Sequence, residues 1–229
     1  MIRLFDNFFP HDVSAGMTDR SVNFERPQES NGFTDSQQRF LRRHGIDLSK
    51  AAQIRQVHGK RVIFISDGIA EIQQSDGLVT DRQNIPLMIR VADCLPVFLY
   101  DTRQKVIGLV HAGWRGTRQQ IALEAIKVMQ EHGQSHVNDI KVGLGPSIRS
   151  CCYEVGEEFK GIFPSETIEK NQALFFDLPG ANRNQLLAAG IVKENICDSR
   201  ICTSCDQRFF SYRRQGQRAG RMLALFKMS

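Results

Sequence analysis

Six short segments rich in apolar and β-branched residues follow one another through the middle of the chain, and this pattern constrains the fold most strongly. It predicts strands over residues 51–57, 61–66, 75–80, 87–91, 95–100 and 106–111. Turns rather than helices join most of these segments. The pattern therefore favours an α+β fold with mixed sheets over a regular βαβ winding.

The rest of the chain supplies helices and a few later strands. Apolar residues recur at helical spacing over residues 116–132, which predicts a helix there, whereas residues 15–36 are polar and typical of a loop. We predict further helices over 36–44, 154–163 and 183–189, and strands over 140–144, 196–201 and 222–226. Because the 229 residues contain no repeat or linker, a single catalytic domain over residues 1–229 is the simplest organisation.

The charge of the chain is positive but not concentrated. The formal net charge is +5 and the pI about 9.0, with basic residues spread over the whole length. Nucleic-acid-binding proteins usually cluster such residues, so we expect a small anionic or phosphorylated substrate and no nucleic acid. No apolar run is long enough to span a membrane, and Asp6 comes too early for a signal peptide. We expect a cytoplasmic protein, and a monomer by default.

An Asp-Cys pair, Asp93-Cys94, interrupts two apolar strands, and Pro96 follows it closely. Six cysteines are too few for a disulfide scaffold in a chain of this size, so the thiols are free, metal ligands or nucleophiles. A cysteine alone at this place would fit the core. The neighbouring aspartate, which is costly to bury without partners, favours a functional role.

A second motif connects a strand to a helix. His111 ends a predicted strand, and Trp114 and Arg115 follow in a turn flanked by Gly113 and Gly116. Small residues let the backbone approach a ligand closely, and the next helix N-terminus can attract an anion. The arginine can bind a phosphate or carboxylate, with a structural ion pair as the alternative, and the tryptophan can stack on a ring, with simple packing as the alternative.

A third motif adds His58, within Gln56-Val57-His58-Gly59. Together with Cys94 and His111 it forms a donor set suited to zinc or copper. Three protein ligands and an open fourth position are the pattern of a catalytic zinc site. The three residues are not locally spaced, so their sequence pattern alone also fits ordinary structural roles.

Several segments in this order resemble the bacterial laccase-domain family, once called multicopper polyphenol oxidases and now regarded as purine nucleoside phosphorylases. The matching segments are residues 56–59, 92–96, 111–116, 145–148, 152–156, 209–214 and 220–222. Family members usually carry a Ser-Thr-Arg and then a Gly-Gly-Val-Ser loop. Here Arg20 matches the family's active-site arginine, but the chain continues directly into Ser21 and the glycine loop is absent.

The resemblance implies a layered α+β sandwich of mixed sheets flanked by helices, distantly related to the cytotoxic necrotising factor deamidases. It implies that His58, Cys94 and His111 bind zinc, with copper a less favoured metal. The implied reaction is phosphorolysis of adenosine, inosine, guanosine and methylthioadenosine, with some adenosine deamination.

The residues suggest how that reaction would be catalysed. In this hypothesis Arg115 and Arg20 hold the phosphate, while Asp93 orients a ligand or acts as a base. The purine of the nucleoside stacks on an aromatic ring, either Trp114 or Tyr153.

Three alternatives use the same residues differently. A thiol hydrolase would employ Cys94 as nucleophile and His111 as base without metal. A copper oxidase acting on phenols would need more histidines than the six present. A protein with reduced catalysis would retain only metal binding, as the shortened N-terminal region allows.

The segment Cys202-Thr203-Ser204-Cys205 is a CxxC motif whose role the sequence leaves open. A structural zinc site would need a second ligand pair, to which Cys197 or the pair Cys151-Cys152 could contribute. Ordinary thiols are the simplest interpretation, and a redox role is the other alternative.

Overall fold

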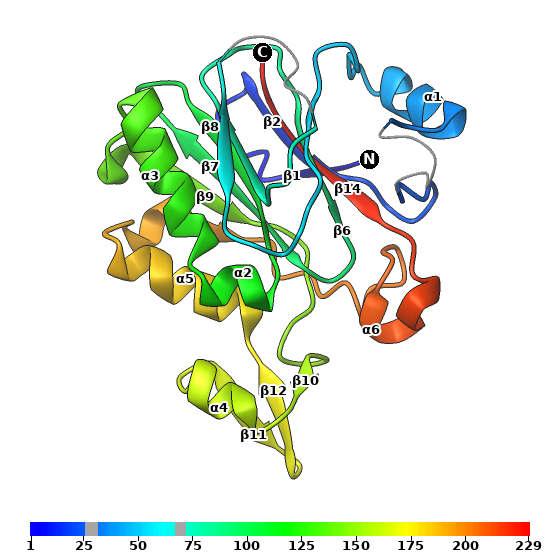
Figure 1. Cartoon of the computed structure of the whole chain (residues 1–229), viewed down its shortest axis with the longest axis vertical. Helices are drawn as coiled ribbons and strands as arrows, with labels where there is room; N and C mark the ends of the chain where they lie inside the picture. The colour runs from blue at the N-terminus through cyan, green and yellow to red at the C-terminus, as the bar shows by residue number, and fades with distance from the viewer. Residues whose placement is uncertain (26–31, 67–71) are drawn as a thin grey trace.

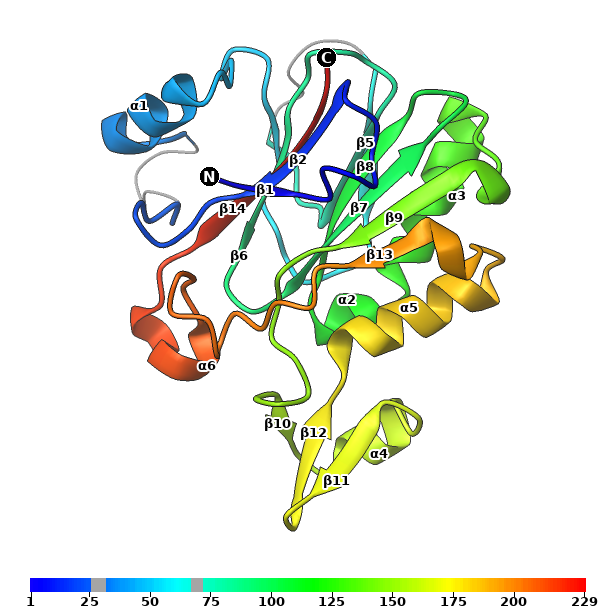
Figure 2. The same ribbon diagram turned by 180° about the vertical axis from the view of Figure 1, so that it is seen from behind.

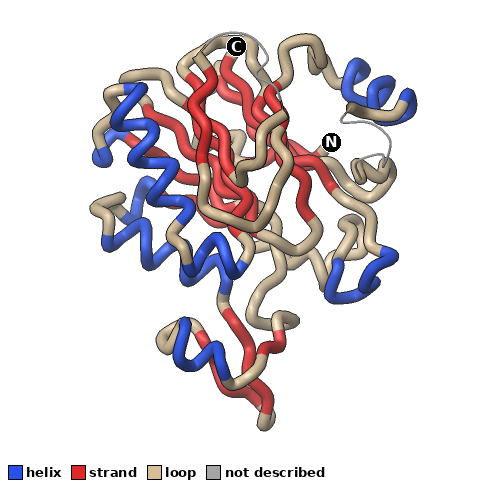
Figure 3. Tube along the Cα trace, viewed as in Figure 1, coloured by secondary structure: helices blue, strands red, loops and turns tan. Residues whose placement is uncertain are grey.

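A computed structural model describes residues 1–25, 32–66 and 72–229. Its centre consists of two mixed sheets packed face to face, with helices on the outside (Figures 1 and 3). The six-stranded sheet contains, in spatial order, β13 (Ile196–Asp198), β9 (Ile140–Leu144), β7 (Leu95–Asp101), β8 (Ile107–Ala112), β5 (Gly77–Thr80) and β4 (Val62–Ile65). The five-stranded sheet contains β1 (Ile2–Leu4), β2 (Val13–Met17), β14 (Met222–Met228), β6 (Leu87–Val91) and β3 (Ala52–Gln53).

Apolar side chains from both sheets interdigitate to form a hydrophobic core between them. Phe98 on β7 meets Phe226 on β14 edge to face, with ring centroids 5.3 Å apart, and Phe9 packs against Phe226 as well. All three side chains are buried. Large aromatic surfaces of this kind dominate the energetics of such a core, which accounts for many of the fifteen phenylalanines.

Helices cover the outer face of each sheet, so that the molecule has four layers (Figures 1 and 2). The six-stranded sheet packs on α3 (Ile121–Gly133) and α5 (Leu178–Ala188). On the other side, α1 (Asp35–Arg43) contributes Leu41 to a small core with Met88 and Leu225 of the five-stranded sheet. The expected α+β sandwich of mixed sheets flanked by helices is confirmed.

A small three-stranded sheet lies below the sandwich in Figures 1 and 2. It consists of β10 (Glu154–Val155), β12 (Ala173–Phe176) and β11 (Thr167–Lys170), beside α4 (Glu158–Ile162). Phe159 of α4 packs against Phe176 with centroids 5.3 Å apart, and Tyr153 packs 5.6 Å from the same ring. Trp114 packs 5.4 Å from Phe159 and so joins this aromatic group to the sandwich.

Several predicted elements differ from the structure. The helix predicted over residues 116–132 is two helices, α2 (Trp114–Arg118) and α3, separated where Gln120 has a φ of 59°. The helix predicted over 154–163 begins instead as strand β10, because those residues pair with β12. The loop predicted over 15–36 is wrong at its start, where β2 continues to Met17 and pairs with both β1 and β14.

The remaining small elements connect these layers. They are the helix α6 (Tyr212–Gln215) and the single-turn helices η1 (Val137–Asp139), η2 (Lys193–Asn195) and η3 (Gly216–Arg218). Within residues 1–25, 32–66 and 72–229, no helix is both apolar and long enough to cross a membrane.

Candidate functional site

Strand register brings the Cys94 and His111 motifs together. Strands β7 and β8 are antiparallel and pair Leu95 with Ala112, so Cys94 just before β7 lies opposite the end of β8. His58 reaches the same point from the loop that follows β3. The ligand atoms of the histidine–cysteine group, defined as His58, Cys94 and His111, all lie within 4.8 Å of one another. The group can therefore hold one metal ion.

A buried carboxylate, Asp76, organises this group. One of its oxygens accepts hydrogen bonds from the His111 ring Nδ1, at 2.9 Å, and from the backbone N–H of His58, also at 2.9 Å. The other accepts from the backbone N–H groups of Val57, at 3.1 Å, and Gly59, at 2.7 Å. The bond to Nδ1 leaves Nε2 of His111 facing Cys94. A carboxylate that orients a histidine in this way is a common support of metal ligands.

The charges of the group favour a thiolate. Burial raises the pKa of Cys94, but His111 and His58 outweigh that effect and lower it to about 6. Burial likewise opposes protonation of His111, yet Cys94 and Asp76 raise its pKa to about 9. Thiolate is the form of cysteine that binds metals and acts as a nucleophile.

Backbone geometry near the group is unusual. His58 and Asp93 both have left-handed backbones, with φ of 58° and 81°. Such conformations cost a non-glycine residue about 1–3 kcal/mol. A Cβ at Gly113 would lie 3.0 Å from Cys94 Sγ, so this glycine lets the turn approach the thiol.

The group lies in the wall of a cleft of about 980 Å³. Trp114 and Arg115 line it beside the group, and Tyr153 and Phe159 line it from the small sheet. The Arg115 guanidinium stacks on the Trp114 ring at 4.4 Å and makes no ion pair within the described part of the chain. Because α2 has only five residues, its N-terminus offers little to an anion, and the exposed Arg115 is the cationic group of this motif beside the cleft.

Asp93 also borders the cleft, and both of its carboxylate oxygens accept hydrogen bonds from other residues. It accepts hydrogen bonds from the Thr203 hydroxyl at 2.6 Å, the Ser211 hydroxyl at 2.9 Å and the Arg213 backbone N–H at 2.7 Å. The aspartate thus anchors the segment before Cys94 to the C-terminal part of the chain.

The comparison with protein families is decisive about ancestry. The model of the family described as multi-copper polyphenol oxidoreductase laccase matches residues 13–229. The chain belongs to this laccase family.

Relatives within the laccase family carry enzyme names. A purine nucleoside phosphorylase from Borreliella burgdorferi is 32% identical over 174 residues, covering 72% of this chain and 74% of that protein. Adenosine deaminase RL5, from an unknown prokaryotic organism, is 35% identical over 196 residues, covering 77% and 74%. The crystal structure of the hypothetical protein YfiH from Bacillus licheniformis superposes with a TM-score of 0.85 at 27% identity, covering 99% of each chain.

The structure separates one candidate residue of this laccase-family chain from the rest. Arg20 is exposed, donates a hydrogen bond from its guanidinium to the Gln207 carbonyl at 3.3 Å, and is not among the residues lining the cleft. The other candidates, from His58 to Tyr153, all line it.

Asp76 is the residue that sequence reasoning missed. An aspartate inside a strand-like, apolar segment is itself a signal, because it must find partners when buried. Its side chain is fully buried, and β5 pairs with β8 so that the carboxylate faces His111. The partner could be named only once that pairing was known.

Proposed function

We propose that this chain is a zinc-dependent purine nucleoside phosphorylase acting on adenosine, inosine, guanosine and methylthioadenosine. The single observation that carries the proposal is the histidine–cysteine group in the wall of a cleft beside Arg115. Relatives named purine nucleoside phosphorylase support the substrate class. We further propose a monomer in the cytoplasm, with nucleoside and phosphate rather than nucleic acid as partners.

The donor set fits one zinc ion. A thiolate and two imidazoles are ligands that zinc accepts, and Asp76 holds the His111 ring in the required tautomer. The other four histidines lie outside the histidine–cysteine group among the described residues, so a multicopper centre lacks its ligands. When bound, zinc supplies a Lewis acid that polarises a substrate oxygen.

The cleft residues supply positioning for phosphorolysis. In this reaction a phosphate oxygen forms a bond to the ribose C1′, and the C1′–N bond breaks with its electron pair leaving on the purine. Arg115 is placed to hold the phosphate charge, through the bidentate contact that guanidinium makes with oxyanions. Trp114 and Tyr153 offer faces for the purine.

Asp93 acts in this proposal as a positioning residue rather than as a base. Its oxygens accept three hydrogen bonds from Thr203, Ser211 and Arg213, which fix the backbone immediately before Cys94. Arg20 lies outside the cleft lining, so this proposal assigns the phosphate to Arg115 rather than to Arg20.

Adenosine deamination is the second candidate activity. It replaces the 6-amino group of the purine with a water oxygen and releases ammonia. The observation that favours it is the relative named adenosine deaminase RL5, at 35% identity, together with the metal-ligand set in the cleft.

The test incubates purified, zinc-loaded protein with adenosine in the presence and absence of inorganic phosphate, and quantifies adenine, ribose 1-phosphate and inosine. We expect adenine and ribose 1-phosphate in equal amounts, only with phosphate. Inosine formed without phosphate would report deamination. If the zinc-loaded protein released no adenine when phosphate was present, the proposed phosphorylase activity would be refuted.

Two variants distinguish metal from thiol chemistry. Cys94→Ala should lose the zinc of the histidine–cysteine group and turnover together, whereas Cys197→Ala, half-buried on β13 and outside the group, should keep both. Hydrolytic turnover that persists in chelator-treated protein and disappears only in Cys94→Ala would favour the thiol hydrolase. A protein that binds zinc through Cys94 without turning over any of the four nucleosides would have reduced catalysis.

A further inference from the structure

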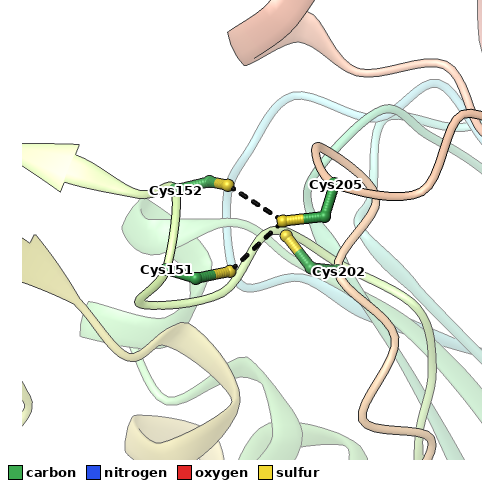
Figure 4. A group of neighbouring side chains, drawn as sticks. All are labelled: Cys151, Cys152, Cys202 and Cys205. Carbon is green, nitrogen blue, oxygen red and sulfur yellow. Dashed lines mark hydrogen bonds between the residues drawn. The ribbon is translucent and has the colours of Figure 1, made fainter.

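Four cysteines lie close together and share no residue with the histidine–cysteine group. Cys151 and Cys152 lie in the loop between β9 and β10, and Cys202 and Cys205 lie in the segment between β13 and α6. Their sulfur atoms all lie within 4.8 Å of one another (Figure 4). We refer to them as the four-cysteine cluster.

The sulfur spacing in the cluster matches a single tetrahedral metal ion. Cys205 Sγ is 3.3 Å from Cys152 Sγ and 3.6 Å from Cys151 Sγ. A disulfide would bring two sulfurs to about 2.05 Å. Four thiolates at about 2.3 Å from one zinc ion lie about 3.8 Å apart, close to the observed spacing.

Backbone contacts hold the two loops together independently of the thiols. Ser147 and Cys202 form an isolated parallel bridge, and the Thr203 N–H donates to the Ser147 carbonyl at 3.0 Å. Arg149 makes a two-pronged ion pair with Asp198 at 2.9 and 2.6 Å, which joins the start of one loop to the end of β13. The cysteines are therefore brought together by the fold rather than by mutual attraction.

Backbone N–H groups also surround the sulfur of Cys202, and Cys205, Arg149 and Ser204 supply them. Cys202 is buried while Cys151 and Cys205 are exposed, so the cluster is anchored in the protein and remains reachable from solvent.

We propose that the four-cysteine cluster is a second metal site, which binds one zinc ion through four thiolates. The site goes beyond the proposed function, because it requires neither nucleoside chemistry nor the histidine–cysteine group. Four protein ligands close the coordination sphere, the arrangement of structural rather than catalytic zinc sites. A cluster of several irons would hold its cysteines further apart than a single ion does.

The position of the cluster gives the ion a role in shaping the cleft. Tyr153, which lines the cleft, directly follows Cys152. Thr203, between the two cysteines of the CxxC motif, donates its hydroxyl to Asp93 at 2.6 Å. A zinc ion in the cluster would thus join the two loops that place the cleft tyrosine and the Asp93 anchor.

The test measures zinc per chain by elemental analysis after the full-length protein is purified with zinc and desalted. We expect two zinc ions in the wild type and in Cys197→Ser, one in Cys202→Ser/Cys205→Ser, and one in Cys94→Ala. Unchanged zinc content in the double variant would overturn the second site. The two sites can be tested separately. If the histidine–cysteine group bound no zinc and the cluster did, the wild type would hold one zinc ion. Cys94→Ala would keep that ion and the double variant would lose it.

A second measurement on the wild type does not depend on how the variants fold. Iodoacetamide should leave the cluster cysteines unmodified in zinc-loaded protein and alkylate all four after chelation, as measured by peptide mass spectrometry. Cys197 should react equally in both states. Equal labelling of the cluster cysteines with and without zinc would overturn the proposal. So would a disulfide between the two loops in non-reduced protein, seen as a linked peptide pair two hydrogens lighter than the two peptides together.

Discussion

The two cysteine-containing sites differ in ligand number, in supporting contacts and in what surrounds them. The histidine–cysteine group offers three ligands, has a buried carboxylate behind it, and faces a cleft. The four-cysteine cluster offers four thiols, is held by backbone bonds and an ion pair, and has two exposed members. A site with an open coordination position beside a cleft can act on a substrate, whereas a closed thiolate site can only join the segments that supply it.

The sharpest contrast between the two sites is the acidity of their thiols in metal-free protein. The pKa of Cys94 is lowered to about 6, chiefly by His111 against the effect of burial, whereas burial and Cys202 raise that of Cys151 to about 11. Cys94 should stay a thiolate above about pH 6 and lose reactivity as the pH falls through that value. Cys151 should gain reactivity only as the pH rises toward about 11.

At pH 7 this difference corresponds to ~10⁴ in thiolate fraction, which the weaker nucleophilicity of the low-pKa thiolate reduces to ~10² in alkylation rate. The measurement is the rate of iodoacetamide labelling of each peptide between pH 5 and 9 after chelation. Over this range the Cys94 rate should level off above about pH 6, whereas the Cys151 rate should still be rising at pH 9. The shape of each pH profile, rather than the absolute rate, corrects for the lower exposure of Cys94. If the labelling rates of the two peptides changed with pH in the same way, the two thiols would not differ in acidity as expected.

The carboxylate behind the histidine–cysteine group gives the next largest effect. Asp76→Asn should weaken zinc binding or turnover about 10- to 100-fold, since an outer partner of a metal ligand typically contributes that much. The amide keeps the size of the side chain but loses the charge that holds the His111 proton. Competition with a zinc chelator measures the affinity at the group, and the cluster's zinc should remain.

If Asp76→Asn lowered the zinc content of both sites, the aspartate would support the fold as a whole rather than the histidine–cysteine group. Circular dichroism and the melting temperature of the variant provide that control.

Arg115 distinguishes substrate binding from metal binding within the catalytic candidate. Arg115→Ala should raise the KM for phosphate about tenfold, the effect of losing a hydrogen bond to a charged group, and leave both zinc ions in place. The matched control is Arg118→Ala, an exposed arginine on the same short helix that does not line the cleft. A change in kcat alone, or equal effects of the two variants, would contradict a phosphate-holding role.

The strand pattern predicted much of the fold. Strands 87–91 and 140–144 agree with the structure to the residue, because buried runs of apolar, mostly branched residues leave few other choices. The break at Gln120 had no local signal, since its left-handed backbone depends on how α2 and α3 pack on the sheet. The start of α5 at Leu178 was missed although a local signal is present, because Asp177 caps the helix and Pro179 stands in its first turn, where proline is favoured.

The candidate sites, like most of the fold, were predicted where the signal is local and missed where it depends on distant contacts. Cys94 and His111 stand in distinctive motifs that the sequence exposes, whereas Asp76 became visible only through the pairing of β5 with β8. The CxxC motif lacked an identified second ligand pair until the Ser147–Cys202 bridge placed Cys151 and Cys152 beside it. Contacts between distant segments, rather than local composition, were the missing information.

The smallest effect should come from crowding the histidine–cysteine group without removing a ligand. A methyl group at Gly113 would lie 3.0 Å from Cys94 Sγ and 3.5 Å from the His58 ring, so Gly113→Ala must shift the thiol by a few tenths of an ångström. We expect zinc affinity at this group to fall only several-fold, because one ligand can adjust. Gly161→Ala is the control, since nothing lies within 4 Å of its new methyl and alanine suits its helix better. If both variants bound zinc like the wild type, close approach of the turn would be unnecessary for the group; if Gly113→Ala lost the ion completely, the group would be more rigid than its open side suggests.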